Sequence, residues 1–185
     1  MSYEDLLKEI NRSKNRITRR SEDPFQSVKL HTGFGYVNSF KTLLLGQGRQ
    51  TRFHSGVELS LGVDLFSEEW YAEGAIRNYG LSRQGAEEIL SRQIDLKFGH
   101  KSELAAPWAV RLEAGLSNHT LRVTDDHKGL ITDELSPSLL VSGELSAQIN
   151  KFISFGLEAS GRNPILQRGI DRGSIDFMMS LKASL

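Results

Sequence analysis

The sequence predicts an all-β protein: an eight-stranded, antiparallel, up-and-down transmembrane β-barrel with a short N-terminal amphipathic helix. Three observations lead to this prediction. Apolar and polar residues alternate with a period of two along most of the chain, long connections alternate with short ones, and the polar face is rich in glycine and serine. A period of two indicates strands, because successive side chains of a strand point to opposite faces.

The composition excludes several classes of protein. The 185 residues carry no formal net charge and include no cysteine. The chain therefore has no global field that would attract nucleic acid, no disulfide framework and no thiolate metal site. We expect no cofactor, no metal and no nucleic-acid partner. No segment approaches the roughly 18 consecutive apolar residues of a membrane-spanning helix. A spanning β-strand, however, needs only about 9–11 residues of alternating character.

The first 24 residues differ from the rest and are expected to form a helical arm, with the barrel in residues 25–185. Tyr3, Leu6, Leu7 and Ile10 have helical spacing, and Ser2 begins an S-x-x-D capping pattern. One interpretation is a solvated arm that leads to another domain. The other is an amphipathic helix that lies on a membrane surface or caps the barrel.

Eight later segments alternate in the manner of strands. In residues 56–65, for example, the sequence GVELSLGVDL places five apolar residues on one face and Gly, Glu, Ser and Asp on the other. The eight segments are expected at 27–38, 53–65, 70–79, 90–99, 108–118, 138–149, 152–160 and 174–185. Because proline cannot donate to a strand ladder, its four occurrences are expected outside these segments or at their margins.

The connections between these segments alternate in length, with long polar loops expected at 39–52, 80–89, 119–137 and 161–173. In this order all long loops lie at one end of the barrel and all short turns at the other. This is the plan of a bacterial outer-membrane barrel, in which the short turns face the periplasm.

The polar face is expected to fill the barrel interior, because small residues suit the cramped lumen of eight strands. A soluble lipocalin-like barrel is the alternative, but its solvated polar face should carry many long side chains. Charges of both signs lie on the polar face, and buried charges must be paired. The expected interior charge network comprises Lys29, Glu58, Asp64, Glu73, Arg77, Asp95, Lys97, Arg111, Glu113, Glu144, Glu158, Asp176 and Lys182.

Aromatic residues gather beside the short turns, as in the interfacial girdle of a membrane barrel. The expected girdle consists of Phe66, Trp70, Trp108 and Phe152. The alternative is that these side chains belong to a core near the strand ends.

With these features the region from residue 27 to the end resembles the small eight-stranded outer-membrane proteins of the OmpA type. Its last strand resembles the assembly signal of such proteins, although Leu185 replaces the usual final aromatic residue. The resemblance implies a monomer in a bacterial outer membrane, in contact with lipid and lipopolysaccharide. Its implied role is structural or anchoring, with loops or the helical arm available to a protein partner.

A lipid-modifying enzyme, such as a lipid A acyltransferase or deacylase, is the second possibility. Some eight-stranded outer-membrane proteins have this activity, which needs a nucleophile or base at the outer rim. Loop residues offer candidates, but no spacing among them forms a trusted catalytic signature, so none is assigned as catalytic. Those candidates are Ser117, His119, Asp125, Asp126 and His127, while His31 and His54 are expected to be hydrogen-bonded inside. A narrow pore is a further alternative.

Overall fold

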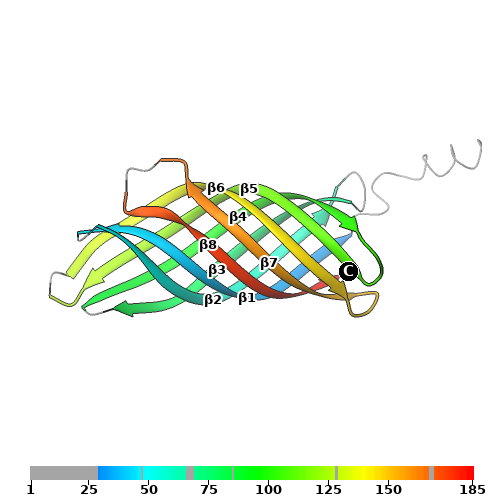
Figure 1. Ribbon diagram of the computed structural model, residues 1–185, viewed down its shortest axis with the longest axis horizontal. Coiled ribbons are helices and arrows are strands. Elements are labelled where there is room, and N and C mark those ends of the chain that lie inside the picture. Colours follow the sequence, from blue (N-terminus) through cyan, green and yellow to red (C-terminus); the bar gives the residue numbers. More distant parts are fainter. Residues whose placement is uncertain (1–28, 47, 66–68, 85, 128, 167–168) are drawn as a thin grey trace, which may run out of the picture.

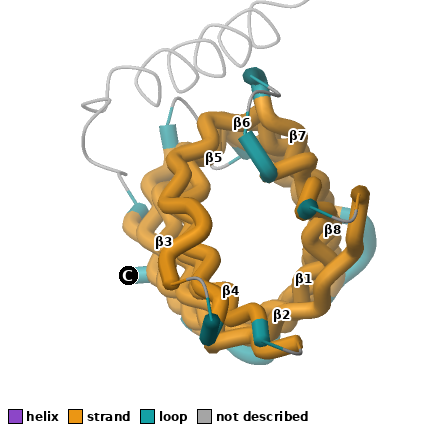
Figure 2. The backbone as a smooth tube through the Cα atoms, turned by 90° about the vertical axis from the view of Figure 1, so that its left-hand side faces the viewer, coloured by secondary structure: helices purple, strands orange, loops and turns teal. Residues whose placement is uncertain are grey.

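The computed structural model describes residues 29–46, 48–65, 69–84, 86–127, 129–166 and 169–185. Eight antiparallel strands form one closed barrel in the order of the sequence, because β1 pairs with both β2 and β8 (Figure 1). Figure 2 shows the strands enclosing the barrel axis. The strands are β1 (Leu30–Leu45), β2 (Gly48–Asp64), β3 (Trp70–Gln84), β4 (Glu87–Glu103), β5 (Trp108–Asp125), β6 (Gly129–Gln148), β7 (Ile153–Pro164) and β8 (Asp171–Ser184).

The predicted eight-stranded antiparallel barrel is confirmed. The predicted helix within residues 1–24 and the girdle residue Phe66 lie outside the described residues. In the part of the chain that the structure describes, no helix is both long enough and apolar enough to cross a membrane.

The predicted long loops are wrong, because the strands continue through most of them. The connections at that end are confined to residues 46–47, 85–86, 126–128 and 165–170. We call this end, at the left in Figure 1, the hairpin end, and the opposite end the turn end.

Pro137 corrects the expectation that prolines avoid the strands, since it lies within β6 opposite Asn118 of β5. Its carbonyl accepts a hydrogen bond from the amide of Ile165. The missing N–H of Pro137 therefore faces β7, whose ladder with β6 stops at Ser138 and Pro164. A proline is tolerated where the neighbouring ladder ends.

The barrel ladder opens toward the hairpin end in two places. Pairing of β2 with β3 stops at Gly56 and Tyr79, and pairing of β6 with β7 stops at Ser138 and Pro164. Beyond these points β3 to β6 continue as one paired sheet, while β1 stays paired with β2 and with the start of β8. The hairpin end therefore consists of two groups of strands that must be held together by side chains.

An apolar cluster supplies that contact, and we call it the hairpin-end cluster. Its members face inward from strands of both groups and are fully or almost fully buried, with Ile170 packed against them. Burial of these side chains provides cohesion that the interrupted ladder lacks. The cluster comprises Leu43, Leu45, Ile89, Leu121 and Val123.

Replacing Leu121 by asparagine is expected to loosen the hairpin end while leaving the barrel closed. The substitution removes buried apolar contacts, for which truncation of a leucine costs about 2–5 kcal/mol, and it adds an amide without a partner. Trypsin should then cleave after Arg122, and the protein should keep its heat-modifiable migration on SDS gels. Leu135→Asn, on the exposed face of β6, is the control. Equal protease resistance of both variants would contradict the role of the cluster.

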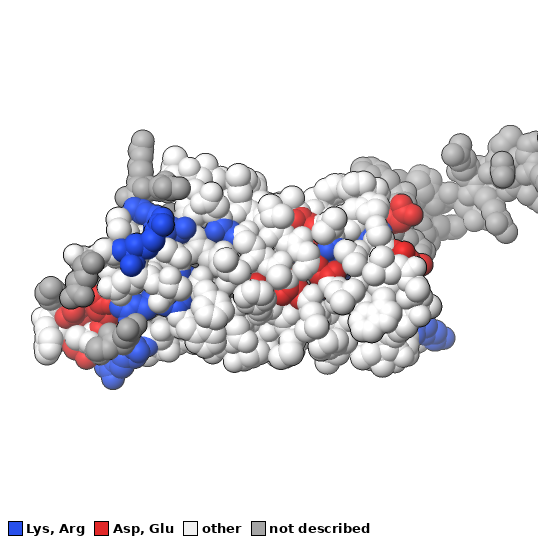
Figure 3. Space-filling model, in the orientation of Figure 1, with Lys and Arg blue, Asp and Glu red and all other residues white. Residues whose placement is uncertain are grey.

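The outer surface of the strands is apolar over the region between the turn end and a ring of asparagines. The outward positions of this region hold no Asp, Glu, Lys or Arg in the described strands, and much of the face in Figure 3 is uncharged. Large exposed side chains of this belt include Phe34, Leu59, Leu61, Ile76, Leu96, Leu112, Leu116, Val141, Leu157, Phe177 and Leu181. Such a surface suits contact with lipid rather than water.

The asparagine ring marks the upper limit of this belt. Each odd-numbered strand has an outward asparagine directly after its apolar stretch: Asn38, Asn78, Asn118 and Asn163. In β4, Arg92 lies opposite Asn78 and donates a hydrogen bond of 2.8 Å from its Nε to the Asn78 side-chain oxygen. Polar groups avoid hydrocarbon because their hydrogen bonds cannot be replaced there. The ring therefore marks the first polar outward positions above the belt, and Phe40 is an exposed apolar residue beyond it on β1.

Candidate functional site in the barrel lumen

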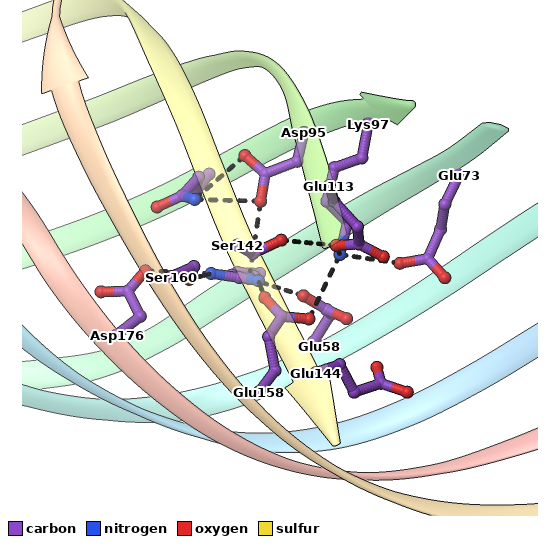
Figure 4. Close-up of polar contacts among 12 residues, drawn as sticks. Glu58, Glu73, Asp95, Lys97, Glu113, Ser142, Glu144, Glu158, Ser160 and Asp176 are labelled. Carbon is purple, nitrogen blue, oxygen red and sulfur yellow. Dashed lines mark hydrogen bonds and ion pairs between the residues drawn. The ribbon is translucent and has the colours of Figure 1, made fainter. Parts of the chain in front are cut away.

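The centre of the lumen is a fully buried arginine, Arg77 of β3, surrounded by carboxylates from four other strands (Figure 4). Its Nε lies 2.5 Å from Glu58 Oε2 and 3.5 Å from Asp95 Oδ2. Its Nη2 lies 2.8 Å from Glu158 Oε1, and its Nη1 lies 2.9 Å from Asp176 Oδ2. A guanidinium presents five donors in one plane, so a single side chain links β2, β4, β7 and β8 to β3.

A second cation, Lys97 of β4, lies fully buried beside this centre. Its Nζ is 2.8 Å from Glu73 Oε1, 2.9 Å from Glu113 Oε2 and 3.3 Å from Glu158 Oε2. Glu158 therefore contacts both Arg77 and Lys97, one through each oxygen. The two groups form one continuous network.

The network continues toward the turn end through Lys182 of β8. The Nζ of Lys182 lies 2.7 Å from Glu144 Oε2 and 3.2 Å from Glu73 Oε2. Arg111 of β5 approaches the same Glu144 less closely, at 3.7 Å from Nη1 to Oε1. Its guanidinium carbon lies 5.2 Å from the centre of the Tyr71 ring.

Small residues leave the space that these long side chains fill. A Cβ atom at Gly156 would collide with the Glu144 carboxylate, and one at Gly99 would collide with the Tyr71 ring. Serines also supply donors, since Ser142 donates a hydrogen bond of 2.6 Å to Glu113 Oε2. The lumen of an eight-stranded barrel is just wide enough to be filled by side chains, and here glycine and serine provide the necessary room.

Two members of the expected charge network lie apart from it. Lys29 is exposed and directly precedes the first residue of β1, at the rim of the turn end. Asp64 is buried near the turn end, where its Oδ1 lies 2.6 Å from His31 Nε2 rather than beside a network cation. His31 also lies 3.0 Å from the Ser184 hydroxyl, through Nδ1.

A second polar group, which was not predicted from the sequence, lies inside the barrel near the hairpin end. Lys41 Nζ lies 3.0 Å from His119 Nε2, and His119 Nδ1 lies 2.7 Å from Asp171 Oδ2. Arg162 donates to both oxygens of Asp171, over 2.6 and 3.0 Å. The available signal was the period of two, which runs past the expected strand end through Ser39, Lys41 and Leu43.

The candidate catalytic residues do not come together as a nucleophile and base. Ser117 and His119 both belong to β5, and their side chains are buried in the barrel lumen. The expected loop position of His119 is therefore wrong. His119 contacts Lys41 and Asp171 instead of a serine hydroxyl. Asp125 accepts a hydrogen bond from the backbone N–H of His127 in the β5–β6 turn, and Asp126 is exposed beside Arg83. Among the described residues, no group of three or more His, Asp and Glu could hold a metal ion.

The aromatic residues expected in the girdle lie near the turn end where they are described. Trp70, Trp108 and Phe152 are all exposed on the outside or rim of the barrel. The Trp70 ring stacks on Phe98 with 5.2 Å between ring centres. These positions suit an interface between lipid and water, where aromatic side chains are favoured.

Comparison with known proteins identifies the fold through structure alone. No family model matches the chain, and no curated protein matches it. Neisserial surface protein A is similar with a TM-score of 0.66 and 11% identity, over 85% of this chain and 97% of that one. The attachment invasion locus protein Ail of Yersinia pestis gives 0.62 and 10%, over 86% and 100%. The outer membrane protein OprG of Pseudomonas aeruginosa gives 0.55 and 12%, over 85% and 95%.

These similarities cover almost the whole of each compared chain and 85–86% of this one. At such low identity they establish the fold and not a shared activity. The closed ladder of eight strands, the apolar outer belt and the charged lumen agree with this fold. The chain therefore has the fold of the small eight-stranded outer-membrane β-barrel proteins.

Proposed function

We propose that this protein is an integral barrel of a bacterial outer membrane that anchors a rigid, outward-facing hairpin end. In this orientation the turn end faces the periplasm, and the apolar belt contacts lipid and lipopolysaccharide. The protein is a monomer in this proposal. The observation that carries the proposal is the blocked lumen, in which a continuous ion-pair network is followed by an apolar cluster. Such a barrel positions its hairpins but offers no path for a solute.

The hairpins are suited to contact a partner outside the membrane. They are built on continuous strands, so their conformational entropy is lost on folding. Ordering them is therefore not a further cost when a partner binds. Exposed side chains of mixed character lie on them, and many Lys and Arg residues of one face gather at this end in Figure 3. Leu130, Ile131 and Leu135 of β6 are among the exposed apolar residues there.

The arrangement supports the alternatives less well. An enzyme acting on lipid needs reactive groups that its substrate can reach, whereas Ser117 and His119 are buried in the lumen. A soluble ligand-binding barrel would keep its apolar face inside, whereas Leu59, Leu61 and Leu112 are each more than 60% exposed on the outside.

The proposal predicts that the purified protein needs detergent to stay monodisperse and conducts no ions. In planar lipid bilayers the wild-type protein should give no discrete conductance steps, because paired charges and the hairpin-end cluster occupy the lumen. A parallel preparation of a known porin serves as the positive control. Stable unitary steps from wild-type protein, or a protein monodisperse in buffer without detergent, would overturn the proposal.

A further inference from the structure

The lumen contains a cavity of about 440 Å³ that opens at the turn end. Tyr71 and Arg111 lie along its wall together with the small polar residues Ser146 and Ser154, and Trp108 lines it near the rim. The cavity is thus bounded by a buried cation and hydroxyl groups. It is separated from the hairpin-end cluster by the whole ion-pair network.

Arg111 differs from the other buried arginines in having little to bind. It is 8% exposed, and its Nε has no hydrogen-bond partner among the described residues. Its nearest carboxylate is Glu144, at 3.7 Å, whose other oxygen is 2.7 Å from Lys182. Arg77, by contrast, contacts four carboxylates.

The carboxylates nearest to Arg111 each lie closer to a lysine than to Arg111. Glu73 contacts both Lys97 and Lys182, and Glu113 contacts Lys97. These lysines compete with Arg111 for the negative charge of the lower network. A buried donor without a partner costs free energy, so an added acceptor at Arg111 would be stabilising.

The mouth of the cavity favours an anion as well. Lys29, Lys101 and Lys151 line it, against the carboxylates of Asp64 and Glu103. Asp64 Oδ1 already lies 2.6 Å from His31 Nε2, and Glu103 Oε1 lies 3.5 Å from Lys101 Nζ. Among the charged side chains that line the opening, three lysines stand against two carboxylates, and an excess of positive charge raises the local concentration of anions.

We propose that the turn-end cavity is a binding site for a small oxyanion, a phosphate or carboxylate group, held by the guanidinium of Arg111. Planar guanidinium groups bind both anions through charge-assisted hydrogen bonds, which are about twice as strong as neutral ones. Ser146 and Ser154 line the same cavity and provide further hydroxyl donors. The inference does not depend on what the hairpin end binds.

The test is a titration of the full chain, folded in an uncharged maltoside detergent, followed by the NMR signal of the Arg111 Nε–H group. Sodium phosphate and sodium succinate are added separately, and sodium chloride at equal ionic strength is the reference. We expect a saturable shift with phosphate, succinate or both, and none with chloride. Saturation by phosphate alone identifies a phosphate site, and saturation by succinate alone identifies a carboxylate site.

Arg111→Lys assigns the signal and should weaken binding by about tenfold, measured on the indole N–H signal of Trp108. Arg122→Lys is the matched control, because Arg122 is exposed at the other end beside Asp133. If Arg111→Lys does not fold, the double variant Lys101→Gln and Lys151→Gln should weaken binding by about threefold. A shift that is absent, that chloride reproduces, or that Arg122→Lys reduces as strongly would overturn the proposal.

Discussion

Replacing Arg77 by methionine is expected to destabilise the barrel by about 3–5 kcal/mol, the usual cost of removing one partner from a buried ion pair. Four carboxylates would lose their shared cation in a lumen that water cannot enter freely. The measurement is urea-induced unfolding in lipid vesicles, followed by tryptophan fluorescence and by mobility on SDS gels. The loss should appear as a lower midpoint of unfolding.

Arg83→Met is the matched control for this experiment. Arg83 also has carboxylate neighbours, Glu88 at 2.8 Å and Asp126 at 3.3 Å, but its side chain is 59% exposed. Exposed ion pairs contribute about 0–1 kcal/mol. Adding Glu58→Gln to Arg77→Met should restore part of the stability by removing one of the carboxylate charges that Arg77 had paired. Equal losses for Arg77→Met and Arg83→Met would show that the lumenal network is not what stabilises the barrel.

Replacing Leu112 by arginine is expected to cost about 2–4 kcal/mol, because an arginine at the middle of the lipid-facing belt must enter hydrocarbon. Thr120→Arg, on the same outward face of β5 but beyond Asn118, should cost less than about 1 kcal/mol. Both positions are exposed, so packing inside the barrel is unchanged. Unfolding by urea in lipid vesicles measures both costs.

The comparison tests where the lipid boundary lies, because Leu112 is at the middle of the belt and Thr120 lies beyond Asn118 on the same face of β5. A large cost at both positions would place the boundary nearer the hairpin end than the asparagine ring does. A small cost at both positions would show that this belt does not face lipid.

The sequence predicted those parts of the strands in which one face stays apolar and the other stays polar. From Gly56 to Asp64 the outward residues are apolar and the inward residues are polar or glycine, so both period and face could be read. In β1 the inward face changes from Ser39 and Lys41 to Leu43 and Leu45. The alternation is lost there, because the outward Leu44 is apolar as well, and the strand was mistaken for a loop.

The pairing inside the lumen could be expected only in general terms. Charges of both signs on one face predict that partners exist, but the register between strands decides which atoms meet. Lys29 and Lys182 look equivalent in the sequence, yet only Lys182 reaches Glu73 and Glu144. Likewise, Lys41 meets His119 because strands far apart in the chain close around the same lumen.

The network also has a consequence for the last step of barrel assembly. Its contributions from β8 are Asp176 and Lys182, which contact Arg77, Glu73 and Glu144 from earlier strands. In an open sheet these charges remain hydrated, and their attraction is screened by water. Seam closure between β8 and β1 expels that water and strengthens all the pairs together. Electrostatic attraction thus favours the closed barrel over intermediates in which β8 and β1 are only partly paired.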